Sequence, residues 1–216
     1  MSDLIAYYTA HSDMVFTAIQ EHILISLTAV CFGFLVASPA GIALTKHPRT
    51  AAIVLGFFSA VNTIPSIVLL GVAMMILGIG FWPSTAVLFL YSLLPIMRNT
   101  YTGITGVDEK YIKAARGMGM SRVQILTKVQ IPLALPVIIA GIRLSAIYII
   151  SWATLSAFIG AGGLGDLIWM GLQSYNFNLV LCGAIPATLL ALAASLLLTF
   201  VEKLASRKLH GGGDAV

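Results

Sequence analysis

The sequence predicts an all-α integral membrane protein with about five transmembrane helices, and two observations support this prediction. Hydrophobic residues make up 59% of the 216 residues and charged residues only 9%, against about 25% charged residues in an ordinary soluble domain. The mean hydropathy is +0.98. The few charges are also clustered, so long uncharged runs remain that a bilayer accommodates better than water does.

The uncharged runs place the individual crossings. Residues 23–44 carry no charged side chain, enough for one helix of about 20 residues, and residues 50–97 carry none, enough for two. After residue 128 the only charges before residue 202 are Arg143 and Asp166. The expected crossings are 22–44, 52–77, 84–104, 132–157 and 178–202.

The basic residues predict the orientation. Every Lys and Arg except Arg143 lies between crossings one and two, at or after the end of crossing three, or after crossing five. The positive-inside rule makes these segments cytoplasmic, so the N-terminus is expected outside and the C-terminus inside. The net charge of +4 then reflects topology, and no nucleic-acid partner is expected.

The chain is expected to form a single transmembrane domain over residues 1–216 with three peripheral parts. These are an N-terminal arm at 1–20, a cytoplasmic loop at 105–130 and a short disordered tail at 206–216. The two cysteines lie inside apolar runs, where they are expected to pack as small residues rather than to bind a metal.

The cytoplasmic loop has a helix–break–helix pattern. Asp108 suits the start of a helix, Gly117 and Gly119 end it, and Ser121 opens a capping box with the glutamine three residues later. The small residues Ala114, Ala115, Gly117 and Gly119 are expected to be exposed for close contact with another protein. An ordinary basic loop would explain the charge but not this Ala-Ala-x-Gly-x-Gly pattern.

This loop resembles the EAA loop of ABC-importer membrane subunits, whose pattern is Glu-Ala-Ala, three residues, Gly, nine residues, then Ile-x-Leu-Pro. Here the pattern stands as Lys113-Ala114-Ala115, Gly119 and Val129-x-Ile131-Pro132, with every interval kept. Lys113 replaces the usual Glu, so no salt-bridge role of that acid is carried over. IGAGGLGDLI at 159–168 is similar to the segment after the fourth crossing in these subunits. Both blocks imply the fold of a type I ABC-importer permease.

Two further blocks look like the osmoprotectant branch of the family, which imports glycine betaine, carnitine and choline: NTIPSIVLLG at 62–71 and LLPIMRNTYTGITGVD at 93–108. The methionine-importer branch shares the GAGGLG block and the length, and is the alternative. A stand-alone secondary carrier would need internal repeats and ionisable residues at the midplane, and the sequence offers only Arg143. A non-transporting membrane scaffold would leave the small-residue surface of the loop unused.

The resemblance implies partners rather than an enzyme. We expect a second permease subunit, identical or related, two cytoplasmic ABC ATPases, an extracellular or periplasmic binding protein, and the lipid of a bacterial cell membrane. The chain contains no G-x-x-x-x-G-K-[ST] loop, so it is expected to hold no cofactor, with ATP and Mg²⁺ used by the ATPase. The expected ATPase-contact residues are Lys113, Ala114, Ala115, Gly117, Gly119, Ser121 and Arg122.

Several membrane residues are candidates for the solute path. Pro65 interrupts crossing two, and broken helices line binding sites in transporters; aromatic faces attract quaternary ammonium groups. A kink satisfied by Ser and Thr, and ordinary aromatic packing, are the alternatives. The candidates are Asn62, Thr63, Ser66, Tyr148 and Trp152.

Arg143 lies well inside crossing four, where a charge costs about 2.5–3.5 kcal/mol. It is expected either to face a cavity or to bond neighbouring helix ends, and both alternatives stay open.

The outer segments are expected to include a tight re-entrant turn followed by a short surface helix at 166–174. They are interpreted as a docking site for the binding protein, or alternatively as rigid connectors. The docking candidates are Phe81, Trp82, Gly162, Gly163 and Gly165.

Overall fold

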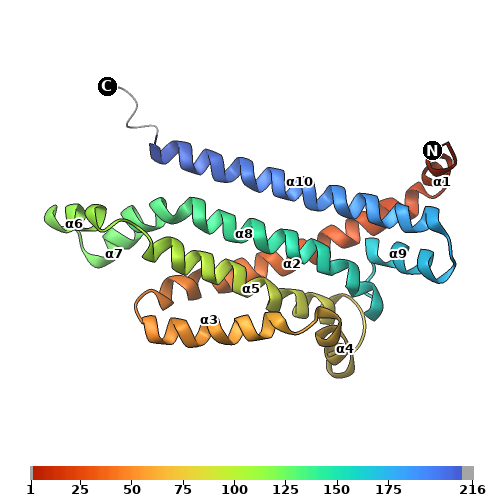
Figure 1. Cartoon of the computed structure of the whole chain (residues 1–216), viewed down its shortest axis with the longest axis horizontal. Helices are drawn as coiled ribbons and strands as arrows, with labels where there is room; N and C mark the ends of the chain where they lie inside the picture. The colour runs from red at the N-terminus through yellow and green to blue at the C-terminus, as the bar shows by residue number, and fades with distance from the viewer. Residues whose placement is uncertain (1, 211–216) are drawn as a thin grey trace.

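The structure, a computed structural model, describes residues 2–210, with side chains described from residue 6 to residue 206. The secondary structure of this part of the chain is entirely helical (Figure 1). The elements are α1 (Ser2–Ala10), α2 (Ser12–Leu44), α3 (Pro48–Thr63), α4 (Ser66–Leu77), α5 (Phe81–Thr105), α6 (Glu109–Gly117), α7 (Arg122–Ile125), the π-helix η1 (Leu126–Gln130), α8 (Ile131–Ala153), the 3₁₀-helix η2 (Thr154–Ile159), α9 (Leu164–Gln173) and α10 (Phe177–His210).

The long helices form a bundle centred on α5. Helix α5 packs against both α2 and α8, while α10 packs mainly on α8 and α9 (Figure 1). The largest buried apolar cluster joins α2, α5 and α8 through residues such as Ile25, Leu88 and Ile149, each 0% exposed. The bundle places α6 and α7 at one end and α1 and α9 at the other.

Three helical segments are long and apolar enough to cross a membrane: Ser12–Leu44, Arg122–Ile159 and Phe177–Ser206. The pair α3 and α4 passes the same test together, although it is bent by 92°. Helix α5 has 25 residues and falls outside this set. It carries many polar side chains and is largely covered by its neighbours, so it need not be apolar all round. The described residues thus hold three helical segments suited to cross a membrane, or four with the bent pair, and the number five stays a prediction.

The expected crossing at 52–77 is interrupted at Ile64 and Pro65, as the proline led us to expect. Proline disfavours the α-conformation in the residue before it, and Ile64 is extended, with φ −70° and ψ 131°. The hydroxyl of Tyr91 in α5 donates to the carbonyl of Ile64 at 2.6 Å. The break is thus held by a neighbouring helix, and α4 turns away from α3 (Figure 1).

The helix ends also differ from the expectation. Helix α2 begins at Ser12, so much of the predicted N-terminal arm is helical. Helix α10 continues to His210 and so includes the first residues of the expected tail, whose disorder stays a prediction. The rest of that tail, residues 211–216, lies outside the described part of the chain.

The second helix of the cytoplasmic loop is not separate from the fourth crossing. Helix α7 runs through η1 directly into α8. Pro132 has no N–H for the carbonyl four residues earlier, and its ring would clash with that carbonyl in a regular α-helix. The wider π turn at 126–130 lies directly before this proline and relieves that clash.

Candidate functional site

The coupling segment, defined as residues 106–130, begins with a capped helix. Asp108 is the N-cap of α6 and accepts a hydrogen bond from the backbone N–H of Lys110 at 2.9 Å. The ammonium group of Lys110 lies 3.0 Å from the same carboxylate. The backbone hydrogen bond, followed by the side-chain contact, holds the pKa of Asp108 below its usual value. The predicted start of this helix is confirmed.

The break that follows is also confirmed. Helix α6 ends at Gly117, and Gly119 has a φ of +79°, a conformation that favours glycine. Ser121 and Gln124 form the predicted capping box: the Ser121 N–H donates to Oε1 of Gln124 at 2.8 Å, and the Gln124 N–H donates to Oγ of Ser121 at 3.3 Å. The next helix therefore starts in a defined direction.

The coupling segment presents an open surface of small residues. Ala114, Gly117 and Gly119 are exposed. Apart from the adjoining backbone, no atom of the described residues lies within 4 Å of where a side chain would begin at either glycine. Met118 and Val123 are 74% and 69% exposed beside them. Ala115, also expected at this surface, is only 1% exposed, and the helix that carries it packs on α7 and η1.

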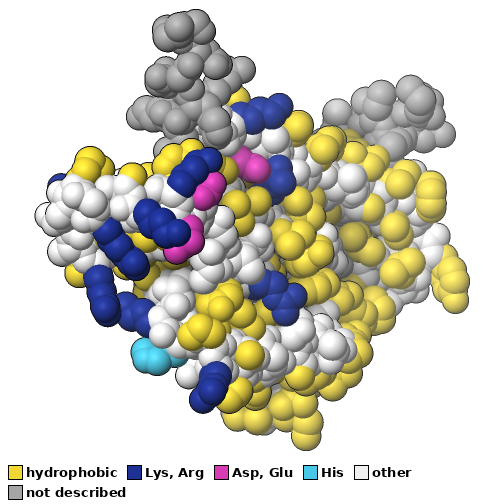
Figure 2. Space-filling view, turned by 60° about the vertical axis from the view of Figure 1, so that its left-hand side comes forward, with side chains coloured by type: hydrophobic (Ala, Val, Ile, Leu, Met, Phe, Trp, Pro, Cys, Tyr) yellow, Lys and Arg dark blue, Asp and Glu magenta, His cyan; other side chains and the backbone are white. Residues whose placement is uncertain are grey.

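The charged residues of the coupling segment surround this surface. Nζ of Lys113 lies 3.1 Å from Oε2 of Glu109, one helical turn earlier, and both side chains are exposed. Ser121 and Arg122 are exposed as well. Figure 2 shows Lys and Arg side chains gathered at this end of the bundle, with apolar side chains between them.

Two of the proposed solute-path residues meet on α8. The rings of Tyr148 and Trp152 are stacked, with centroids 5.5 Å apart and an interplanar angle of 28°. Tyr91 of α5 adds a third ring, 4.8 Å from Trp152. Tyr148 is 41% exposed, whereas Tyr91 is buried. The pair on α8 follows from sequence spacing, but no sequence signal indicated Tyr91 as its neighbour.

The other solute-path residues lie at the break between α3 and α4. The side chain of Asn62 donates to the carbonyl of Phe58 at 3.1 Å, and Thr63 donates to the carbonyl of Ala60 at 2.6 Å. Both side chains thus satisfy the last turn of α3, as the kink interpretation expects. Ser66 is buried at the start of α4. Tyr91 connects this break to the aromatic rings, because its hydroxyl binds the carbonyl between the two helices.

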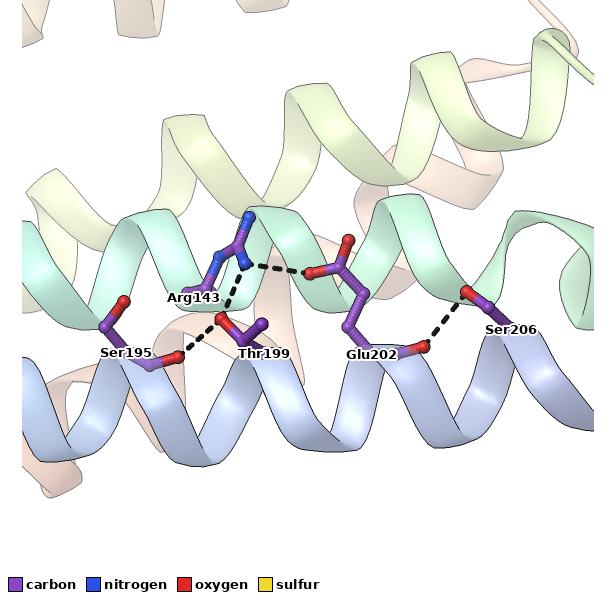
Figure 3. A network of polar contacts seen from close by, with 5 residues as sticks. All are labelled: Arg143, Ser195, Thr199, Glu202 and Ser206. Atoms are coloured by element: carbon purple, nitrogen blue, oxygen red, sulfur yellow. Dashed lines mark hydrogen bonds and ion pairs between the residues drawn. The ribbon is translucent and has the colours of Figure 1, made fainter.

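The intramembrane charge Arg143 is bonded to α10. Its Nη1 donates to Oγ1 of Thr199 at 2.8 Å and lies 3.1 Å from Oε2 of Glu202 (Figure 3). Of the two alternatives for Arg143, this geometry supports a contact between helices.

At the other end of the bundle, the glycine turn, defined as residues 159–165, is held by α2. The N–H of Gly163 donates to Oε2 of Glu21 at 2.8 Å. His22 is 0% exposed, and its Nε2 donates to the carbonyl of Ile150 at 3.0 Å. Gly162 and Gly163 have φ angles of +81° and +85°. Neither Glu21 nor His22 was predicted to take part, because they lie more than 130 residues away in sequence.

The candidate docking residues divide between exposed and buried positions. Trp82 is 69% exposed and meets Phe81 edge-on at 5.1 Å. Gly163 and Gly165 are buried, and a side chain at Gly165 would collide with the backbone of Thr154. Packing therefore accounts for both glycines, and a docking role for them stays a prediction. The two outer segments do touch: the N–H of Gly80 donates to the carbonyl of Ile159 at 2.8 Å.

A depression of about 350 Å³ lies beside the glycine turn, lined by three carboxylates, Asp13, Glu21 and Asp166. Burial, followed by the nearby charge of Glu21, raises the pKa of Asp166. The segments at this end, 78–84 and 158–177, contain no Lys or Arg, whereas the other end carries the basic residues together with carboxylates such as Asp108 and Glu109.

A bundle of long apolar helices defines the class of multi-pass membrane proteins. The sequence matches the family model of the binding-protein-dependent transport system inner membrane component over residues 29–211. The chain belongs to this family of permeases.

Curated relatives and solved structures agree with this assignment. The carnitine transport permease protein OpuCB of Listeria monocytogenes is 45% identical over 202 residues, covering 94% of this chain and 93% of that protein. The choline transport system permease protein OpuBB of Bacillus subtilis is 46% identical over 193 residues, covering 89% and 87%.

Among solved structures, the fold is similar to that of the MetNI methionine ABC transporter in an inward-facing conformation. The TM-score is 0.77 at 22% identity, with 91% of this chain and 98% of that chain covered. An amino acid ABC transporter with histidines gives a TM-score of 0.76 at 18% identity, covering 92% and 97%. At these identities the likeness supports the fold alone, that of type I importer permeases.

Proposed function

We propose that this chain is the pore-forming subunit of an ATP-driven importer of osmoprotectant quaternary amines such as glycine betaine, carnitine or choline. The observation that carries the proposal is the 45% identity to a carnitine permease along 94% of the chain, together with the 46% identity to a choline permease. The methionine alternative has weaker support, because the likeness to the methionine transporter is a likeness of fold at 22% identity.

The coupling segment is the proposed ATPase-docking site. Its exposed small residues leave space for a close fit, and Met118 and Val123 offer apolar contact at the rim. The proposed contacts are Lys113, Ala114, Gly117, Gly119, Ser121 and Arg122, with Ala115 supporting them from beneath. Two cytoplasmic ATPases would use ATP and Mg²⁺, and two permease subunits, identical or related, would form the pore.

The opposite end is the proposed docking face for a binding protein outside the cell. The grouping of Lys and Arg around the coupling segment supports this orientation, with the N-terminus outside and the C-terminus cytoplasmic. Trp82 is the most exposed of the docking candidates on this face. Phe81, Gly162, Gly163 and Gly165 would shape the surface around it.

The solute path is proposed to pass the aromatic pair on α8 and the break between α3 and α4. Tyr148 and Trp152 supply ring faces, and a cation over such a face gains about 0.5–2 kcal/mol. Asn62, Thr63 and Ser66 supply polar groups near the break. Contacts of this strength suit a path, because a solute bound too tightly would not leave.

The test is uptake by the importer assembled from this chain, its ATPase and its binding protein in proteoliposomes. We expect the ATPase to co-purify with the chain from detergent, and labelled choline or carnitine to accumulate with ATP. Trp152→Ala is expected to slow that uptake severalfold and Trp152→Phe to preserve most of it, with ATPase and binding-protein docking unchanged. Methionine uptake without quaternary-amine uptake would overturn the proposed substrate class.

A further inference from the structure

A cluster of polar side chains joins α8 to α10 inside the bundle. One nitrogen of Arg143, Nη1, reaches both Oγ1 of Thr199 at 2.8 Å and Oε2 of Glu202 at 3.1 Å (Figure 3). The Thr199 hydroxyl donates to the carbonyl of Ser195 at 2.7 Å, which leaves its lone pairs directed to the guanidinium. Among the ion pairs of residues 6–206, this one alone connects two long helices.

The two helices differ in how they are connected to the coupling segment. Helix α8 continues directly from α7 and η1, so a displacement of the coupling segment reaches α8 through unbroken helix. Helix α10 enters the bundle from the opposite end, after α9, and has no covalent connection to the coupling segment other than through α8, η2 and α9. Side-chain contacts must therefore carry any such displacement from α8 to α10.

The surroundings of α10 indicate that its position depends on the contact with α8. Between α2, α8 and α10 lies an apolar cavity of about 710 Å³, bordered on α10 by residues such as Ala193 and Leu197. Along this stretch α10 is separated from α2, and it packs mainly on α8 and α9. Apolar contacts between helices have little directional preference, whereas an ion pair of low solvent exposure (31% for Arg143, 26% for Glu202) fixes one register.

We propose that Arg143 is a positioning residue that locks α10 to α8, so that both helices move as one unit when the ATPase displaces the coupling segment. Arg143 acts through Glu202 and Thr199 and does not touch the solute. The inference rests on the proposed function, since it presupposes an ATPase at the coupling segment. Loss of the lock should leave ATP hydrolysis intact and reduce the solute moved per ATP.

The experiment measures labelled choline taken up per ATP hydrolysed by the full importer in proteoliposomes. The double variant Arg143→Gln with Glu202→Gln removes the lock without leaving a charge unpaired, and we expect its uptake per ATP to fall at least fivefold. The exchange Arg143→Glu with Glu202→Arg, and the conservative Arg143→Lys, should stay within twofold of the parent. Thr199→Val keeps the ion pair and the side-chain shape, and should cost about twofold.

Thermal unfolding and ATPase co-purification are measured on the same samples to separate this role from simple stabilisation. A purely structural role would lower stability, uptake and ATP hydrolysis together at a constant ratio, and that result would overturn the proposal. Uptake per ATP equal to that of the parent in the double Gln variant would overturn the proposal as well. So would a low uptake per ATP in the variant with Arg143 and Glu202 exchanged. If the double Gln variant is not produced in measurable amount, the uptake per ATP of the exchanged pair and of Thr199→Val decides between the two roles. If the parent chain itself brings no ATPase, the proposed function has failed rather than this inference.

Discussion

The two glycine-rich segments of this protein look alike in sequence and differ completely in surroundings. At the coupling segment, Gly117 and Gly119 have no atom within 4 Å of a potential side chain. At the glycine turn, the same position at Gly163 lies against His22, and that at Gly165 against the backbone of Thr154. The first pair faces open space, whereas the second pair is surrounded by its own chain.

This comparison shows two different reasons why glycine occupies a position. At the glycine turn, close approach of α2 and η2 requires it, so the turn is part of the folded bundle. At the coupling segment, a φ of +79° favours glycine at position 119, but no described residue elsewhere in the fold occupies the space around Gly117. A partner is the natural occupant of that space, which agrees with the proposed ATPase docking.

The largest effect is expected at Gly165. Gly165→Ala would place a methyl group into the backbone of Thr154, which cannot move aside as a flexible side chain can. Overpacking typically costs about 1–3 kcal/mol, and a collision with backbone belongs near the upper end of that range. We expect a large drop in the thermal unfolding midpoint in detergent. Gly71→Ala is the matched control, because this helical glycine has nothing within 4 Å and alanine favours the helix by about 0.5–1 kcal/mol. Equal midpoints for the two variants would contradict the comparison.

The coupling segment should show the opposite behaviour, with function lost and folding kept. Gly119→Trp places a bulky group into open space, and the positive φ adds a local strain of about 1–2 kcal/mol. We expect the chain to insert and fold despite this strain, because no packed atom has to move. Its ATPase should dissociate on purification, and uptake should fall at least tenfold.

The control at this position is Gly119→Asn, since asparagine tolerates the left-handed conformation better than most residues. It should retain docking and most of the uptake. Normal uptake and ATPase co-purification in Gly119→Trp would remove the partner explanation for this surface.

The smallest effect is expected at the carboxylates beside the glycine turn. Burial and the charge of Glu21 raise the pKa of Asp166, so the folded protein binds a proton there more tightly than the unfolded chain. The stability that this proton supplies is present at low pH and lost as the pH rises through the raised pKa.

Asp166→Asn cannot ionise and should therefore be slightly more stable than the parent at neutral pH. The gain should stay below about 1 kcal/mol, since solvent screens a partly exposed group. It should disappear as the pH falls toward the ordinary carboxyl value of 3.8. The test is to compare the unfolding midpoints of Asp166→Asn and the parent from about pH 4, where the carboxyl is largely protonated, to about pH 8, where it is ionised. A difference in stability that grows toward low pH would contradict the prediction.

Much of the architecture was predictable because it depends on local composition and spacing. The apolar runs predicted membrane helices, and the capping box at Ser121 and the break at Gly119 are short-range patterns that hold wherever the segment lies. The spacing from Lys113 to Pro132 indicated the family, and the family match over residues 29–211 confirms it. The Lys and Arg side chains gather at one end of the bundle as expected, because the order of helices and loops along the sequence decides at which end each of them falls.

Only the tertiary structure decided which distant residues meet. Arg143 donates a hydrogen bond to Thr199, 56 residues later, and Glu21 accepts one from Gly163 across 142 residues. Tyr91 binds the carbonyl of Ile64 at the helix break and also contacts Trp152. The 92° turn between α3 and α4 likewise depends on a neighbouring helix as well as on Pro65. A helical period indicates which side of a helix is apolar, but the partner of a polar side chain depends on how the helices pack in three dimensions.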